Sequence, residues 1–137
     1  MKLKLDWATR RFVEQELRFY PRLLQEWEEL RGDIIECQQR AEVAVSGGQV
    51  GNPTEQKALR LITSPYLKRL EITVSAIQQA LEQLDDEGRR LIELTYWTQG
   101  LSAAGIARRL FMDERTYRRK KVKCLEFIAL HLGLIPW

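Results

Sequence analysis

The side chains most able to do chemistry lie near the C-terminus, where basic residues are concentrated between Ser102 and Lys123. This segment has eight Lys and Arg residues and two acidic residues, Asp113 and Glu114, and therefore a net charge of +6. Residues 1–84 are balanced by comparison, with 12 basic and 12 acidic side chains. A concentrated positive patch beside a neutral body is typical of proteins that contact the phosphates of a nucleic acid.

Two short helices joined by a turn are expected to position these charges. Ser102 is a typical N-cap and predicts a helix that ends near Leu110. The turn Phe111–Asp113 follows, and Asp113 can cap a last helix that runs to about Leu132. The turn lacks the glycine often found there, which the motif does not require. One side of the last helix is apolar and the opposite side is basic, which predicts a helix-turn-helix that enters the DNA major groove.

Position on the two helices divides their polar side chains into two sets. An arginine can bond the O6 and N7 atoms of guanine, and a glutamate can accept from the amino group of cytosine. The side chains predicted to contact bases are Glu114, Arg115, Thr116 and Arg119. Those predicted to contact phosphates are Ser102, Arg108, Arg109, Arg118, Lys120 and Lys123. A shift of one residue in helix register would exchange the roles of Arg118 and Arg119.

The chain before this segment also reads as helix. Asp6 can cap a first helix, which should stop or kink near Tyr20 because proline disfavours helical geometry in the residue before it. A second helix is expected from Pro21 to about Val45. Apolar residues recur at alternating spacings of four and three along both helices, which is the pattern of a coiled-coil stripe.

A second stripe of the same kind follows a flexible loop over Ser46–Asn52. A helix is expected after Pro53, another begins at Ser64-Pro65, and the stripe runs from Leu70 to Leu84. Two stripes joined by a short loop imply antiparallel packing within one chain, pairing between chains, or both.

The third region begins at Asp85-Asp86, which should cap a supporting helix over Glu87–Thr98 that ends at a left-handed Gly100. The sequence therefore predicts an all-α protein in two domains. Residues 1–83 form a long N-terminal helical hairpin that serves as a scaffold or for dimerisation, and residues 84–137 form a C-terminal helix-turn-helix domain.

No enzymatic activity, metal site or cofactor is expected, because the sequence contains no phosphate loop, nucleophile motif or zinc motif. His131 is the only histidine, and we expect it to be structural. Cys37 and Cys124 are predicted to be free buried thiols. No apolar run approaches the roughly 20 residues of a membrane span. The N-terminal MKLKLDW has no signal-peptide core, so we place the protein in the cytoplasm.

Two family resemblances refine this interpretation. The segment LDDEGRRLIELTYWTQGLSAAGIARRLFMDERTYRRKK resembles the region-4 helix-turn-helix of bacterial sigma factors. With VEQELRFYP, NPTEQKALRLITSPYLKRLE and the second stripe, nearly the whole chain resembles the RinA-type phage transcriptional activators. That resemblance implies an activator of late phage or prophage genes for packaging and morphogenesis. Recognition helices of these families often begin with a serine cap, whereas this one begins with Asp113-Glu114.

The sequence and the resemblance together predict a sequence-specific activator that binds double-stranded promoter DNA, acts with the host RNA polymerase and forms a homodimer. Two alternatives belong to other classes. A small terminase-like packaging component also joins a helix-turn-helix to an oligomerising hairpin, but its DNA-binding unit usually comes first. A sigma-like factor would act directly with core RNA polymerase.

Overall fold

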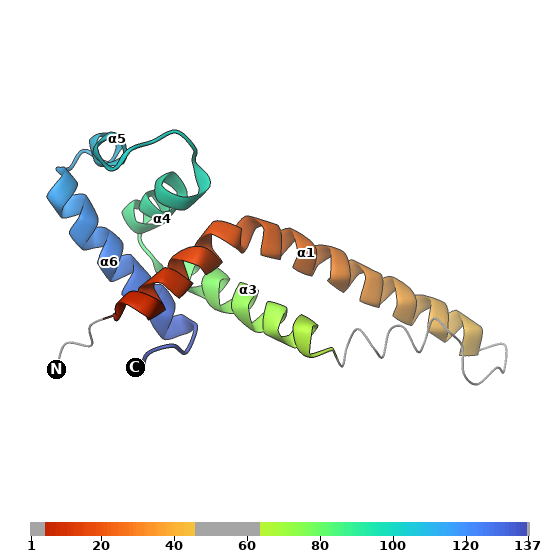
Figure 1. Ribbon diagram of the computed structural model, residues 1–137. Helices are drawn as coiled ribbons and strands as arrows, with labels where there is room; N and C mark the ends of the chain where they lie inside the picture. The colour runs from red at the N-terminus through yellow and green to blue at the C-terminus, as the bar shows by residue number, and fades with distance from the viewer. Residues whose placement is uncertain (1–4, 46–63, 137) are drawn as a thin grey trace. The chain divides into compact units, whose positions relative to one another are not determined.

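A computed structural model describes residues 5–45 and 64–136 of the protein. Every regular element among these residues is a helix, so the predicted all-α class is confirmed for them. No described helix has both the length and the apolar composition needed to cross a membrane. In chain order the elements are α1 (Trp7–Val45), α3 (Pro65–Gln83), α4 (Asp86–Ile92), η1 (Glu93–Trp97), α5 (Ala103–Arg109) and α6 (Glu114–His131) (Figure 1).

The beginning of α1 agrees with the sequence, but its length does not. The Thr9 backbone N–H donates to Asp6 Oδ1 over 2.6 Å, and this bond lowers the pKa of Asp6, as expected for an N-cap. The helix then continues through Pro21 to Val45. The prediction of two helices that meet at Pro21 is therefore wrong. The predicted loop over 46–52 and the helix expected after Pro53 lie outside the described residues.

A hydrogen bond from a distant side chain explains how α1 accommodates its proline. Proline has no N–H, so Pro21 leaves the carbonyl of Leu17, four residues earlier, without its helical partner. The Trp97 indole Nε1–H donates to this carbonyl over 2.7 Å. The Trp97 ring also packs against Tyr20, with ring centroids 5.7 Å apart. Trp97 thus supplies the donor that the proline removes.

The segment that contains Trp97 is a turn of π-helix, η1, whereas the sequence predicts one α-helix over Glu87–Thr98. A π turn sets consecutive side chains closer together around the axis than an α-helix does. Three residues in a row use this geometry. The Thr95 and Tyr117 hydroxyl oxygens lie 2.8 Å apart, the Tyr96 hydroxyl donates to Glu14 Oε2 over 3.1 Å, and Trp97 bonds Leu17.

The caps that surround η1 are local and agree with the sequence. Asp85 Oδ1 accepts from the Gly88 N–H at the start of α4, over 2.7 Å. A Cβ atom added to Gly88 would lie 2.9 Å from that oxygen, so a larger residue would displace the Asp85 carboxylate from this contact. After η1 the chain turns at Gly100, whose φ of +80° is the predicted left-handed conformation.

The chain divides into two compact units. The first joins the part of α1 up to Tyr20 to the chain from Ser75 onward, and the second covers residues 21–74. In the second unit, the Tyr66 hydroxyl of α3 donates to Glu26 Oε1 of α1 over 2.5 Å. This division differs from the expected boundary at residues 83 and 84, and the assignment of those two segments to separate domains stays a prediction. The fully buried large side chains of the first unit are Val13, Leu17, Ile77, Leu91, Ile92, Leu125 and Ile128.

A double-mutant cycle can test whether the Trp97 indole N–H replaces the backbone N–H that Pro21 lacks. Trp97→Phe keeps an aromatic ring but leaves the Leu17 carbonyl without its donor, so we expect a loss of about 1–3 kcal/mol in the free energy of unfolding. In a Pro21→Ala background the backbone N–H at position 21 can bond the same carbonyl, and the loss should be smaller. Urea denaturation of the four proteins measures the difference. Equal losses in both backgrounds would contradict this account.

Candidate nucleic-acid interface

Asp113 fixes the start of α6. Its Oδ1 accepts from the Thr116 backbone N–H over 2.7 Å, as the sequence predicts for an N-cap. Hydrogen bonds from Thr116 lower the pKa of Asp113, and the positive charges of Arg119 and Arg115 lower it further. The carboxylate therefore stays ionised at neutral pH and holds the first turn of α6 beside two arginines.

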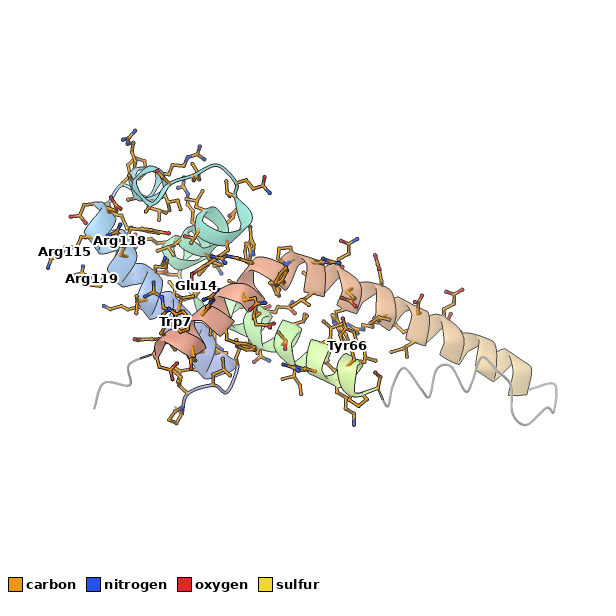
Figure 2. The ribbon with its side chains drawn as sticks, in the orientation of Figure 1. Trp7, Glu14, Tyr66, Arg115, Arg118 and Arg119 are labelled. Carbon is orange, nitrogen blue, oxygen red and sulfur yellow. The ribbon has the colours of Figure 1, made fainter. Side chains whose placement is uncertain are left out.

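The two sides of α6 differ as the sequence predicts. Tyr117, Leu125 and Ile128 are at most 2% exposed and pack into the first unit. The exposed cations of the helix are Arg115, Arg118, Arg119 and Lys123. In Figure 2, Arg115 and Arg119 extend from the first half of α6, away from α4. Because Arg118 and Arg119 are both exposed, the helix register allows either to reach a ligand.

Two cations of α6 form ion pairs with carboxylates of the same chain. The Arg118 guanidinium bonds Glu114 Oε1 over 2.6 Å, one helical turn away. The Lys120 ammonium bonds the Glu87 carboxylate of α4. Glu114, a predicted base contact, and Arg118 and Lys120, predicted phosphate contacts, are therefore already paired within the chain.

The other predicted cations of α5 and α6 differ from Arg118 and Lys120. No ion pair joins them to a carboxylate in the described part of the chain. They form an unneutralised positive surface on α5 and α6, which we call the α5–α6 basic surface. Its members are Arg108, Arg109, Arg115, Arg119 and Lys123, all exposed.

Side chains with hydroxyl groups complete the predicted set. Ser102 Oγ accepts from the Gly105 N–H over 3.1 Å and caps α5, as expected, and its own O–H proton remains available to a further acceptor. Thr116 is half-buried in the first turn of α6. Both residues lie where the sequence places them.

The turn between α5 and α6 has a conformation that the sequence did not indicate. Phe111 has a φ of +57°, which is the left-handed region usually occupied by glycine. Its N–H donates to the Arg108 carbonyl and the Met112 N–H donates to the Ala107 carbonyl, which is the Schellman pattern of a helix end. The Phe111 side chain is 91% exposed. A large apolar residue therefore occupies a strained position in the turn without packing inside the chain.

Glu14 on α1 is a member of the unit that sequence reasoning missed. Its Oε1 accepts from Arg10 Nε over 3.3 Å, and its Oε2 accepts from the Tyr96 hydroxyl. Burial and the charge of Glu14 raise the pKa of Tyr96 far above its usual range, so the phenol remains a donor. The only sequence signal was the four-residue spacing of Arg10 and Glu14, which is common on solvated helices.

The Cys124 thiol and the His131 ring both lie in packed surroundings. Burial, and then the charges of Asp85 and Glu87, raise the pKa of the free Cys124 thiol to about 11, so it stays protonated at neutral pH. The His131 ring meets the Phe127 ring edge to face, with centroids 4.7 Å apart. The side chain of Cys37 lies outside the described residues. Within the described ranges, no cluster of three or more His, Cys, Asp or Glu residues could hold a metal.

Comparison with known proteins assigns the chain to a family. The family described as "Protein of unknown function (DUF722)" matches residues 29–129, which is most of the chain. The protein belongs to this family. The matched range includes the whole α5–α6 basic surface. It begins within α1 and leaves out the first turns of that helix. No curated protein and no solved structure matches the chain.

The strain at Phe111 gives a stability prediction. Phe111→Gly should raise the free energy of unfolding by about 0.5–1 kcal/mol, because glycine adopts a positive φ freely and the exposed ring makes no buried contact. Phe111→Ala is the matched control, since it removes the ring and keeps the Cβ atom that causes the strain. Thermal or urea unfolding measures both. An equal gain from the two variants would show that the backbone conformation is not the cause.

Proposed function

We propose that this member of the family is a sequence-specific DNA-binding protein whose α5, turn and α6 act as a helix-turn-helix. The observation that supports the proposal is the division of α6 into two sides. Tyr117, Leu125 and Ile128 anchor one side, while Arg115 and Arg119 are exposed on the other and form no ion pair within the described residues. A rigid helix that presents unneutralised arginines near its N-terminal end suits entry into a major groove.

Arg115, Thr116 and Arg119 are the base-reading residues in this proposal. Arg115 and Arg119 are four residues apart, so they lie on one face of the helix and can meet neighbouring base pairs. Each guanidinium can bond a guanine through two hydrogen bonds. Glu114 takes part only if its ion pair with Arg118 opens, and it would then accept from a cytosine amine.

The phosphate-binding residues surround this reading set. Arg108, Arg109 and Lys123 supply unpaired charge, and the Ser102 hydroxyl can donate to a phosphate oxygen. Arg118 and Lys120 must exchange Glu114 and Glu87 for phosphate. Both ion pairs are partly exposed and therefore weak, so the exchange has a small free-energy cost.

The biological role in this proposal comes from the sequence resemblances. A similarity to sigma-factor region 4 and to RinA-type activators supports promoter DNA as the target and the host RNA polymerase as a partner. The role is then activation of late phage genes in the cytoplasm of a bacterial host. The predicted hairpin of residues 1–83 would join two copies, and the exposure of Ile35 and Ile72, at 46% and 65% in the single chain, supports this role.

The division of roles can be tested by comparing Arg119→Ala with Lys123→Ala. Arg119→Ala should weaken binding to the preferred duplex by about 1–3 kcal/mol and relax the preference at one base pair. Lys123→Ala should weaken binding to every duplex alike, because a phosphate contact reads no sequence. Both side chains are exposed, so both variants should fold. Titration against the preferred duplex and single-base variants measures the effects. An equal loss on preferred and random duplexes for Arg119→Ala would remove it from base reading.

A further inference from the structure

One face of α1 in the first unit is lined by arginines that the proposed function does not use. Trp7, Arg10, Arg11, Glu14 and Arg18 recur at helical spacing and border a hollow of about 480 Å³. Figure 2 labels Trp7 and Glu14 on these turns. We call these five residues the α1 arginine face. Three of them are cationic and one is acidic, so the net charge of the face is positive.

The single carboxylate of the face is already occupied. Glu14 is 19% exposed and accepts from both Arg10 and Tyr96, so it neutralises Arg10. Arg11 and Arg18 are exposed and form no ion pair with a carboxylate in the described ranges. These two guanidinium groups are therefore the surplus charge of the α1 arginine face.

Trp7 holds one of the two surplus arginines in place. The Arg11 guanidinium lies 5.2 Å from the centroid of the Trp7 ring, which is 72% exposed. A cation–π contact of this kind restrains the side chain without using its N–H donors. The Arg11 group is thus held at the surface with its hydrogen-bonding capacity available for an anion.

The charges of the α1 arginine face act on Lys121 of α6. Lys121 of α6 is half-buried, and its ammonium lies 5.9 Å from the Tyr117 ring centroid. Burial lowers the pKa of Lys121, and the charges of Arg10, Arg118 and Arg18 lower it further against the opposing charge of Glu14. Arg10 and Arg18 of α1 and Arg118 of α6 thus all lower the pKa of Lys121, and all belong to the same compact unit.

We propose that Arg11 and Arg18 bind backbone phosphates of the duplex beside the site that α6 reads. The inference rests on the proposed function and adds a second contact region to it. Arg11 and Arg18 are seven residues apart, or about 10 Å along the helix, so they can reach two separate phosphates. Guanidinium groups suit this role because they bond phosphate oxygens in pairs. Contacts of this kind add affinity and salt dependence but no base preference.

The test is the salt dependence of binding by the full chain with Arg11→Gln and Arg18→Gln combined. Each phosphate contact contributes about 0.9 to the slope of log affinity against log salt, so the double variant should lose about 1.8 from the slope. The wild type should then lose about tenfold more affinity than the variant between 50 and 200 mM salt. The base preference should not change. Phosphate ethylation interference should show two fewer inhibitory phosphates at one edge of the footprint.

A matched control removes two exposed cations from α3 in the other compact unit, with Lys68→Gln and Arg69→Gln combined. Its slope should stay close to that of the wild type. An unchanged slope for the Arg11 and Arg18 variant would overturn the inference alone, and would leave an acidic protein surface as the partner of this face. An equal fall in slope for both double variants would also overturn it, because total charge would then be the cause. A wild-type chain that binds no duplex would overturn the proposed function as well.

Discussion

The hydrogen bond from the Trp97 indole to the Leu17 carbonyl is the contact on which the first compact unit depends. Pro21 leaves that carbonyl without a helical donor, and a buried unpaired carbonyl costs about as much as several favourable contacts provide. The indole that reaches it belongs to the π turn η1, in which Tyr96 also bonds Glu14 and Thr95 bonds Tyr117. One break in the hydrogen bonding of α1 and one irregular turn thus join segments about 80 residues apart in sequence.

The same π turn also contacts the buried side of α6. Thr95 bonds the Tyr117 hydroxyl, and the apolar side of α6 packs below that contact into the core. On the opposite side, no ion pair joins Arg115 or Arg119 to a carboxylate among the described residues, while Glu114 and Glu87 pair with Arg118 and Lys120. The unit therefore keeps a surplus of unneutralised arginine on a rigid helix. Maintaining such a surplus opposes folding through charge repulsion, so a function that uses it is the simplest physical reason for its presence.

Local features of the fold could be predicted from the sequence, and non-local ones could not. The caps at Asp6, Asp85, Ser102 and Asp113 each depend on a backbone N–H three residues ahead, so the sequence alone contains both partners. The amphipathic division of α6 is local for the same reason. The continuity of α1 through Pro21 depends instead on Trp97, and no periodicity relates these two residues.

The candidate site follows the same rule. The exposed cations of α6 were predictable from helical spacing, whereas the pairing of Lys120 with Glu87 requires α4 and α6 to pack together. The left-handed conformation of Phe111 could not be predicted, because glycine is the residue that usually signals it. The most direct test of the central claim is to select bound duplexes from a random pool with the full chain and to sequence them. A single consensus is the predicted result, and a bound pool with the same composition as the starting pool would contradict sequence-specific binding.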